Sequence, residues 1–274
     1  MKIALQSASA RHPAAHPGAA QAIRGLTLKV SAGEQVAVIG PSGAGKTTLL
    51  QLLACALPPS AGTLTLDDQT PWQLPRAGLQ RLRGRLFLAP QVPPLPPRQR
   101  VVTAVLAGRL PAMSTWQSLR SLFYPMDIPA AFDALDRFDL GDKLFERADR
   151  LSGGERQRVG LARTLLSPAS LWLIDEPLSA LDPTRSRQAI DTLLSAARER
   201  GTTLVTTLHQ VDVALTCFPR IVGLRDGALA FDLPAAEVTQ DRLAVLYAQH
   251  EHELTGPAPL AADNMPSVQP VVMH

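Results

Sequence analysis

The segment that most constrains the fold is GPSGAGKT at residues 40–47. It follows the short apolar run QVAVIG and precedes KTTLLQLLACAL, in which apolar side chains recur at helical spacing. Gly-x4-Gly-Lys-Thr between a strand and a helix predicts a loop that binds the phosphates of a nucleoside triphosphate. A strand, a loop and a helix in this order are typical of a parallel α/β sheet.

Each residue type in this loop has a chemical purpose. Glycines let the backbone wrap around the phosphates, Lys46 reaches the β- and γ-phosphates, and the Thr47 hydroxyl binds Mg²⁺. The predicted ATP-binding residues of the loop are Gly40, Pro41, Ser42, Gly43, Ala44, Gly45, Lys46, Thr47 and Thr48.

The rest of the chain alternates between strand-like and helical patterns, which favours a parallel sheet with helices on both faces. A long helical pattern from about residue 100 to 165 interrupts the alternation and predicts an inserted helical segment. Further strands are predicted at 63–66, 85–91, 171–175, 202–209 and 220–227.

A second anion-binding helix start is indicated by LSGGERQRVG at residues 151–160. A serine and two glycines ahead of a helix expose backbone N–H groups where the helix dipole is positive. No lysine follows this stretch, so one chain carries two phosphate-binding patterns of different kinds.

Polar residues follow three of the apolar strands, where open α/β sheets bind ligands. In LWLIDEP, Asp175 is suited to hold Mg²⁺ through water, and Glu176 to orient and polarise an attacking water. Gln91 can offer its amide oxygen to the metal or the water, and His209 can contact the γ-phosphate. An ordinary loop glutamine and a structural histidine are the alternatives for these two residues.

In their order and spacing these motifs resemble an ABC-type ATPase over about residues 1–250, and LSGGERQ is the diagnostic piece. The resemblance implies an α/β P-loop core, with a RecA-like parallel sheet and an antiparallel β part, plus an inserted helical subdomain. It implies one domain over 1–254, with the core at 1–91 and 166–254 and the helical subdomain at 92–165. Residues 255–274, rich in Pro and Ala without periodicity, are predicted to be a disordered tail.

The resemblance also implies a homodimer in which two cassettes pair head to tail around ATP. Lys46, Glu176 and His209 would be catalytic, and Thr47, Gln91 and Asp175 would hold Mg²⁺. Asp182 would link the two sites across the dimer interface. The residues expected to contact the ATP held by the other subunit are Ser152, Gly153, Gly154 and Glu155.

The adenine platform is a separate expectation from the same resemblance. That family stacks an aromatic ring upstream of the loop, and HPGAAQAIRGLTLKV puts His16 at the position of the ring. His12 lies close by, and a plain loop histidine is an equal alternative.

Several fragments resemble the ATP-binding subunit of phosphonate importers: VLAGRL followed by STWQSLRSLFYP, TTLHQVDVAL, and RADRLSGGERQRVGLAR. The proline-rich PPLPPRQR and the histidine at the adenine position depart from that family. The resemblance implies two membrane permease subunits as partners, an extracytoplasmic substrate-binding protein as an indirect one, and a peripheral place on the cytoplasmic face of the inner membrane. An importer ATPase for another small solute, or a non-transport ABC ATPase, is the alternative.

The distribution of charge and the lengths of the apolar runs agree with a peripheral place on the membrane. The 27 Lys and Arg against 24 Asp and Glu are scattered, which argues against nucleic acid as a partner. The apolar runs fall short of the ~18 residues of a membrane span, and the start of the chain lacks the apolar core of a signal peptide. Cys55 and Cys217 have no metal-site spacing and are expected to be buried free thiols.

A permease-docking surface is predicted at Pro93 to Arg100 together with STWQSLRSLF. Helical spacing can place apolar side chains of the second segment on one face. Packing inside the helical insertion is an equal alternative for Trp116 and Phe123. The side chains concerned are Trp116, Leu119, Leu122 and Phe123.

Overall fold

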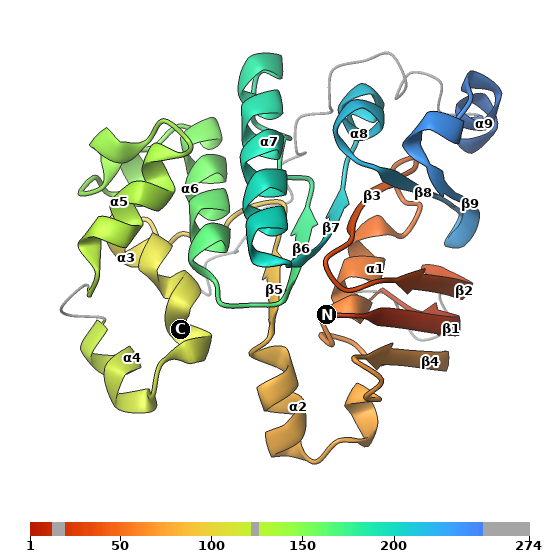
Figure 1. The fold of residues 1–274 in the computed structure, drawn as a ribbon, viewed down its shortest axis with the longest axis horizontal. Coiled ribbons are helices and arrows are strands. Elements are labelled where there is room, and N and C mark those ends of the chain that lie inside the picture. Colours follow the sequence, from red (N-terminus) through yellow and green to blue (C-terminus); the bar gives the residue numbers. More distant parts are fainter. Residues whose placement is uncertain (13–19, 122–125, 249–274) are drawn as a thin grey trace, which may run out of the picture.

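A computed structural model describes residues 1–12, 20–121 and 126–248, and Figure 1 shows two sheets and a helical arm. The larger sheet has six strands in the order β5-β6-β7-β3-β8-β9. The first five strands of that order are parallel, which confirms the predicted sheet. The bounds are β3 Gln35–Ile39, β5 Leu86–Ala89, β6 Leu171–Asp175, β7 Thr203–Thr207, β8 Arg220–Arg225 and β9 Ala228–Pro234.

The edge strand β9 was not predicted, and it runs antiparallel to β8. Asp226 and Gly227 join the two strands and both have positive φ, 51° and 78°. An Asp-Gly pair with positive φ at both residues is the strongest short hairpin signal. The sequence RDG therefore carried the information for this strand.

The smaller sheet is antiparallel, in the order β2-β1-β4, and it is the antiparallel β part that the resemblance implies. It packs with helix α1 against one face of the large sheet, where Val36 and Val38 of β3 point. The bounds are β1 Ile3–Ala10, β2 Ile23–Val30, β4 Ala61–Leu66 and α1 Lys46–Leu53, with α2 Arg76–Arg83 and the short 3-10 helix η1 Pro71–Gln73 following.

The opposite face of the large sheet buries Ala37 and Ile39 of β3 in a second core. This core joins the C-terminal helices to the helical arm, so the arm is continuous with the α/β part and not a separate globule. The C-terminal helices are α7 Pro183–Arg200, α8 Val211–Cys217 and α9 Gln240–Leu246, with the 3-10 helix η5 Ala235–Glu237 before α9.

Along the chain, the helical arm is inserted between β5 and β6. It lies at the left in Figure 1. Helices α3, α5 and α6 pack on one another through buried apolar residues, whereas α4 has no buried residue. The elements are α3 Val101–Leu106, η2 Ala107–Ala112, α4 Thr115–Ser121, α5 Ile128–Asp136, η3 Gly141–Lys143, η4 Ala148–Arg150 and α6 Gly153–Leu166.

Three further expectations concern the surface and the ends of the chain. In the part that the structure describes, no helix combines the length and apolar character of a membrane span. Cys55 and Cys217 are both free, the first fully and the second partly buried, and burial raises the pKa of Cys55 to about 11. The predicted tail at 255–274 lies outside the described residues.

Candidate active site

The loop at residues 40–47 combines a positive φ with a close backbone contact at two of its glycines. Gly40 has φ 152° and Gly45 has φ 97°. A Cβ atom on Gly40 would lie 2.1 Å from the carbonyl oxygen of Leu224, and one on Gly45 would lie 2.3 Å from that of Ala22. Side chains are therefore excluded where the loop leaves β3 and where it enters α1.

Lys46 is the first residue of α1, and its side chain is only 5% exposed. The ammonium group folds back over the loop and donates hydrogen bonds to the carbonyl oxygens of Gly40 at 2.8 Å and Pro41 at 3.3 Å. The backbone of the loop thus holds the Lys46 ammonium group close to the first residues of the loop. Around it, Pro41, Ala44 and Thr48 are buried, while Ser42, Gly43 and Thr47 are exposed.

Asp175 ends β6 and lies beside the loop. The Thr207 hydroxyl donates a hydrogen bond to its Oδ1 at 2.6 Å, and Asp175 also has a side-chain hydrogen bond with Thr47. Burial raises the pKa of Asp175, while the two threonine hydroxyls and the Lys46 charge act in the opposite direction. A bound cation would favour the ionised carboxylate.

Glu176 follows Asp175 in a left-handed backbone conformation, with φ 46°. Its N–H donates to the Thr207 hydroxyl at 2.9 Å. One carboxylate oxygen accepts from Gln91 Nε2 at 2.7 Å, and the other is 2.5 Å from His209 Nε2. The structure therefore brings together the polar residues that follow three strands, and both Gln91 and His209 contact Glu176.

Oxygen donors of this site match the preferences of Mg²⁺. Thr47, Asp175 and Gln91 supply a hydroxyl, a carboxylate and an amide oxygen, which are hard ligands. The described residues contain no cluster of three His, Cys, Asp or Glu that would hold an ion unaided. Mg²⁺ in phosphoryl-transfer sites uses one or two carboxylates together with phosphate oxygens, so the residues fit that ion.

The second phosphate-binding pattern forms the start of α6, as the sequence predicted. Ser152 caps this helix: its hydroxyl accepts from the Glu155 N–H at 3.2 Å, and its own N–H donates to Glu155 Oε2 at 2.7 Å. The Ser152 N–H holds the pKa of Glu155 below its usual range. Glu155 thus closes the cap of its own helix and fixes the Ser152 side chain.

Of the two neighbouring glycines, only Gly154 lies in a close contact. Gly153 is exposed, and a Cβ atom on Gly154 would lie 2.8 Å from the carbonyl oxygen of Ala180. The α6 start therefore packs on the loop that follows Glu176. In the view of Figure 1, α6 lies to the left of α7 and α1 to its right, so the helices that carry the two predicted phosphate-binding patterns are separated within one chain.

Asp182 caps α7, and its carboxylate accepts from the Arg185 N–H at 3.0 Å. That hydrogen bond lowers its pKa, and the side chain remains exposed to solvent. His16 lies outside the described residues, and His12 is exposed on the segment before it.

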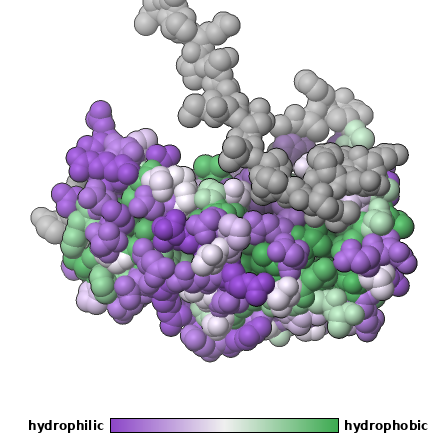
Figure 2. Space-filling model, turned by 90° about the horizontal axis from the view of Figure 1, so that it is seen from above, coloured by the Kyte–Doolittle hydropathy of each residue, from purple (hydrophilic) through white to green (hydrophobic). Residues whose placement is uncertain are grey.

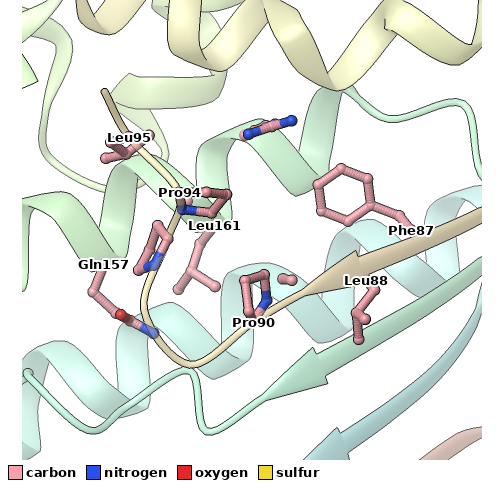
Figure 3. A pocket seen from close by; sticks show the side chains of 11 residues that line it. Phe87, Leu88, Pro90, Pro94, Leu95, Gln157 and Leu161 are labelled. Carbon is pink, nitrogen blue, oxygen red and sulfur yellow. The ribbon is translucent and has the colours of Figure 1, made fainter. Parts of the chain in front are cut away.

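The proline-rich segment after Gln91 packs across α6. A Cβ atom on Gly160 would lie 2.7 Å from Pro93 Cγ, so glycine is needed where the segment crosses the helix. A cavity of about 70 Å³ lies between this segment, β5 and α6, lined by Phe87, Leu95 and Leu161 (Figure 3). The loop that carries Gln91 is thus packed on the helix that Ser152 caps.

Two residues of the site were missed in the sequence. Thr207 bridges Asp175 and Glu176, and Gln157 Nε2 donates to the Glu176 carbonyl oxygen at 3.4 Å. The signal for Thr207 was its place at the end of the strand beside β6, two residues before His209. Gln157 carries no comparable signal, because it is one polar residue among several on α6.

Comparisons with known proteins agree with this geometry. The model of the ABC transporter family matches residues 23–179. The chain is 71% identical to the phosphonates import ATP-binding protein PhnC 2 of Albidiferax ferrireducens, over 100% of this chain and 99% of that protein. It is 52% identical to PhnC 1 of Pseudomonas aeruginosa, over 94% of each chain.

Among solved structures, the chain resembles an ATP-binding cassette described as dimeric, in a post-hydrolysis state, and bound to ADP and Pi. The TM-score is 0.71 at 26% identity, covering 85% of this chain and 98% of the cassette. The cbiO1 protein from Clostridium perfringens also has a TM-score of 0.71, at 21% identity over 90% of this chain and 94% of its own, and it supports the fold.

Proposed function

Because the chain belongs to the ABC transporter family, among relatives named phosphonates import ATP-binding proteins, we propose that it hydrolyses ATP to power the import of a phosphonate or a related phosphorus compound. The observation that carries the proposal is the junction of the loop at residues 40–47 with Asp175, Glu176, Gln91 and His209. That junction combines a glycine-rich loop, oxygen donors that fit Mg²⁺ and a carboxylate that could serve as a base.

In the proposed reaction the loop amides and Lys46 bind the β- and γ-phosphates. Thr47, Asp175 and Gln91 would hold Mg²⁺, which would neutralise charge on the phosphate oxygens. Glu176 orients and polarises the attacking water. Positioning and charge neutralisation supply most of the rate enhancement in phosphoryl transfer.

In this scheme, Gln91 and His209 hold the Glu176 carboxylate before ATP binds. Each binds one oxygen of Glu176, so the carboxylate is held by two neighbours. With ATP bound, the Gln91 amide oxygen would face the metal and His209 would face the γ-phosphate. Glu176 is then free to accept a hydrogen bond from the water.

The separation of the two phosphate-binding helix starts within one chain favours a head-to-tail homodimer. In it, the capped start of α6 binds the γ-phosphate held by the loop of the other subunit, and Asp182 lies at the interface. Two permease subunits would bind this dimer at the cytoplasmic face of the membrane, and the extracytoplasmic binding protein would act through them. ATP is then the bridge that hydrolysis removes.

The proposed function is tested in cells and with the purified chain. We expect a strain lacking this protein to lose growth on a phosphonate as sole phosphorus source and to recover it with the wild-type chain. Growth on inorganic phosphate is the control and should be unchanged. The chain could prove to be an active ATPase whose loss leaves growth on phosphonates and uptake of other phosphorus compounds intact. That result would contradict the proposed substrate class, and the assignment as an ATPase would still stand.

Helix α4 is the proposed site for the permease. Trp116 is 74% exposed and Leu119 is 51% exposed, so the alternative that Trp116 fills a helical core is wrong. The two residues are three apart and share a helix face. Figure 2 looks onto the top of the view in Figure 1, the side away from α4, where hydrophobic residues are interspersed among hydrophilic ones. Leu122 and Phe123, the other apolar side chains predicted in the STWQSLRSLF segment, lie outside the described residues.

Charge substitutions on α4 separate docking from folding. We expect Trp116→Glu and Leu119→Glu to keep basal ATP hydrolysis within about twofold and to leave the melting temperature nearly unchanged, because exposed substitutions alter stability little. The same variants should lose membrane association and transport. Co-purification with the permease, a thermal melt and a transport assay measure these three properties.

The matched control is Leu229→Glu, which places the same charge on an exposed leucine of β9. It should keep membrane association. Docking on α4 would be refuted if the α4 variants still bound the permease, or if each variant that lost transport also lost fold stability.

A further inference from the structure

Tyr247 lies directly beneath the phosphate-binding loop, although it is 207 residues away from Gly40 in the sequence. It follows helix α9, and its side chain is 1% exposed. The Gly40 N–H donates a hydrogen bond to the Tyr247 hydroxyl at 3.2 Å, and this contact is buried. The C-terminal helix therefore contacts the loop at the residue where the loop begins.

The contact is placed on the side of the sheet opposite to α1. The Tyr247 ring belongs to the core that buries Ala37 and Ile39, whereas the leucines of α1 belong to the core on the other face. The loop thus has α1 on one side and Tyr247 on the other. Removal of Tyr247 would leave one side of the loop unsupported.

Gly40 connects Tyr247 to the cation of the site. Its N–H donates to Tyr247, and its carbonyl oxygen accepts from Lys46 Nζ at 2.8 Å. The carbonyl oxygen of Leu224 lies where a Cβ atom on Gly40 would be, so Leu224 packs closely against Gly40. A displacement of Gly40 would therefore move the acceptor that holds the Lys46 ammonium.

Arg225 holds the end of α9 in place. Its guanidinium donates to the carbonyl oxygen of Val245 and, at 3.5 Å, to that of Ala248. These carbonyls lie on either side of Tyr247 in the sequence. A cation at the last carbonyls of a helix stabilises that helix end. Arg225 is next to Leu224, so the strand end that packs on Gly40 also anchors the segment that carries Tyr247.

We propose that Tyr247 is a positioning residue for the nucleotide site: its hydroxyl fixes Gly40, and through Gly40 the place of Lys46, so that the loop is already shaped to receive the β- and γ-phosphates. This inference rests on the proposed ATP binding. Tyr247 is buried and contacts the backbone of the loop, so its loss changes affinity more than the chemical step.

The test compares Tyr247→Phe with the wild type in the full-length chain. ATP binding is measured by displacement of a fluorescent ATP analogue, and kcat and KM are measured with Mg²⁺ and ATP. We expect the Kd and KM for ATP to rise about three- to tenfold, the effect of losing one hydrogen bond that is coupled to binding. We expect kcat to stay within about twofold, because the groups around the water are unchanged.

Ser167→Ala is the matched control, since the buried Ser167 hydroxyl also accepts from a backbone N–H, that of Ala169 at 3.3 Å, at the end of α6. It should leave the Kd for ATP unchanged. Wild-type affinity in Tyr247→Phe, or an equal loss in Ser167→Ala, would overturn the proposal. A wild-type chain that bound no ATP would refute the proposed function instead.

Arg225→Met is a second variant that tests the same contact while keeping Tyr247. It tests the proposal even if Tyr247→Phe does not fold. It frees the end of α9, so the Kd for ATP should rise in the same direction. The double variant should bind no more than about twofold more weakly than Tyr247→Phe, because both changes act on one contact. Unchanged affinity in Arg225→Met, or fully additive losses, would contradict positioning through this helix end.

Discussion

Glu176→Gln is expected to lower ATP turnover by at least about 10²-fold while ATP remains bound. The glutamine side chain has nearly the same size, so it fits between Gln91 and His209, but an amide is too weak a base to deprotonate the water. Lys46 and Asp175 are untouched, so the phosphate and metal contacts proposed for them should persist. A steady-state phosphate-release assay and a filter-binding assay with labelled ATP measure the two properties.

The matched control for this change is Glu237→Gln, an exposed carboxylate on η5 outside the site. It should hydrolyse ATP at the wild-type rate. Normal turnover in Glu176→Gln would sink the assignment of Glu176 as the base. A loss of ATP binding equal to the loss of turnover would instead make Glu176 a residue that shapes the binding site.

Ser152→Arg is expected to abolish the ATP-dependent dimer. In the Glu176→Gln background, where ATP persists, the parent should be a dimer with ATP and a monomer with ADP. The exposed Ser152 hydroxyl caps α6, and a bulky cation there would oppose the helix dipole and occupy the place of the phosphate. We expect association to weaken at least about thirtyfold, the loss that a single interface hot spot produces.

Light scattering with ATP and with ADP measures this prediction, and nucleotide affinity of the monomer should stay nearly intact. Ser114→Arg is the control, because Ser114 accepts from the Gln117 N–H at 3.3 Å and donates its own N–H to Gln117 Oε1 at 2.9 Å at the start of α4. Without permease it should dimerise normally. A Ser152→Arg chain that still paired, or a Glu176→Gln chain that stayed monomeric with ATP and permease present, would contradict the ATP-bridged dimer.

The parts of the fold predicted from residues alone were those with an uninterrupted apolar pattern. The buried strands β3, β6 and β7 consist of apolar and threonine runs, and each was found within two residues of its observed bounds. Strands β1 and β2 were not found as separate elements, because bulges break their alternation of buried and exposed positions, whereas β4 of the same sheet was predicted at 63–66. Helix α2 was missed because only Leu82 is buried in it.

Within the candidate site, Gln91 and His209 were placed by the ends of their strands, but their contact with Glu176 was not foreseen. Parallel strands bring their carboxyl ends to one edge, which is a property of the sheet and follows from the pattern. Which side chain donates to which depends on strand register and rotamers. Thr207 shows the difference, since its pairing opposite Asp175 exists only once β6 and β7 are in register.

The sequence by itself determined the phosphate-binding loop and the capped start of α6. In both, the residues that interact are at most a few positions apart, so local backbone angles and nearby hydrogen bonds are enough to define them. Only the tertiary structure decided that Trp116 is exposed and that Tyr247 supports Gly40. These properties depend on how distant segments pack, and the free energy of such contacts comes from burial that no short stretch of chain encodes.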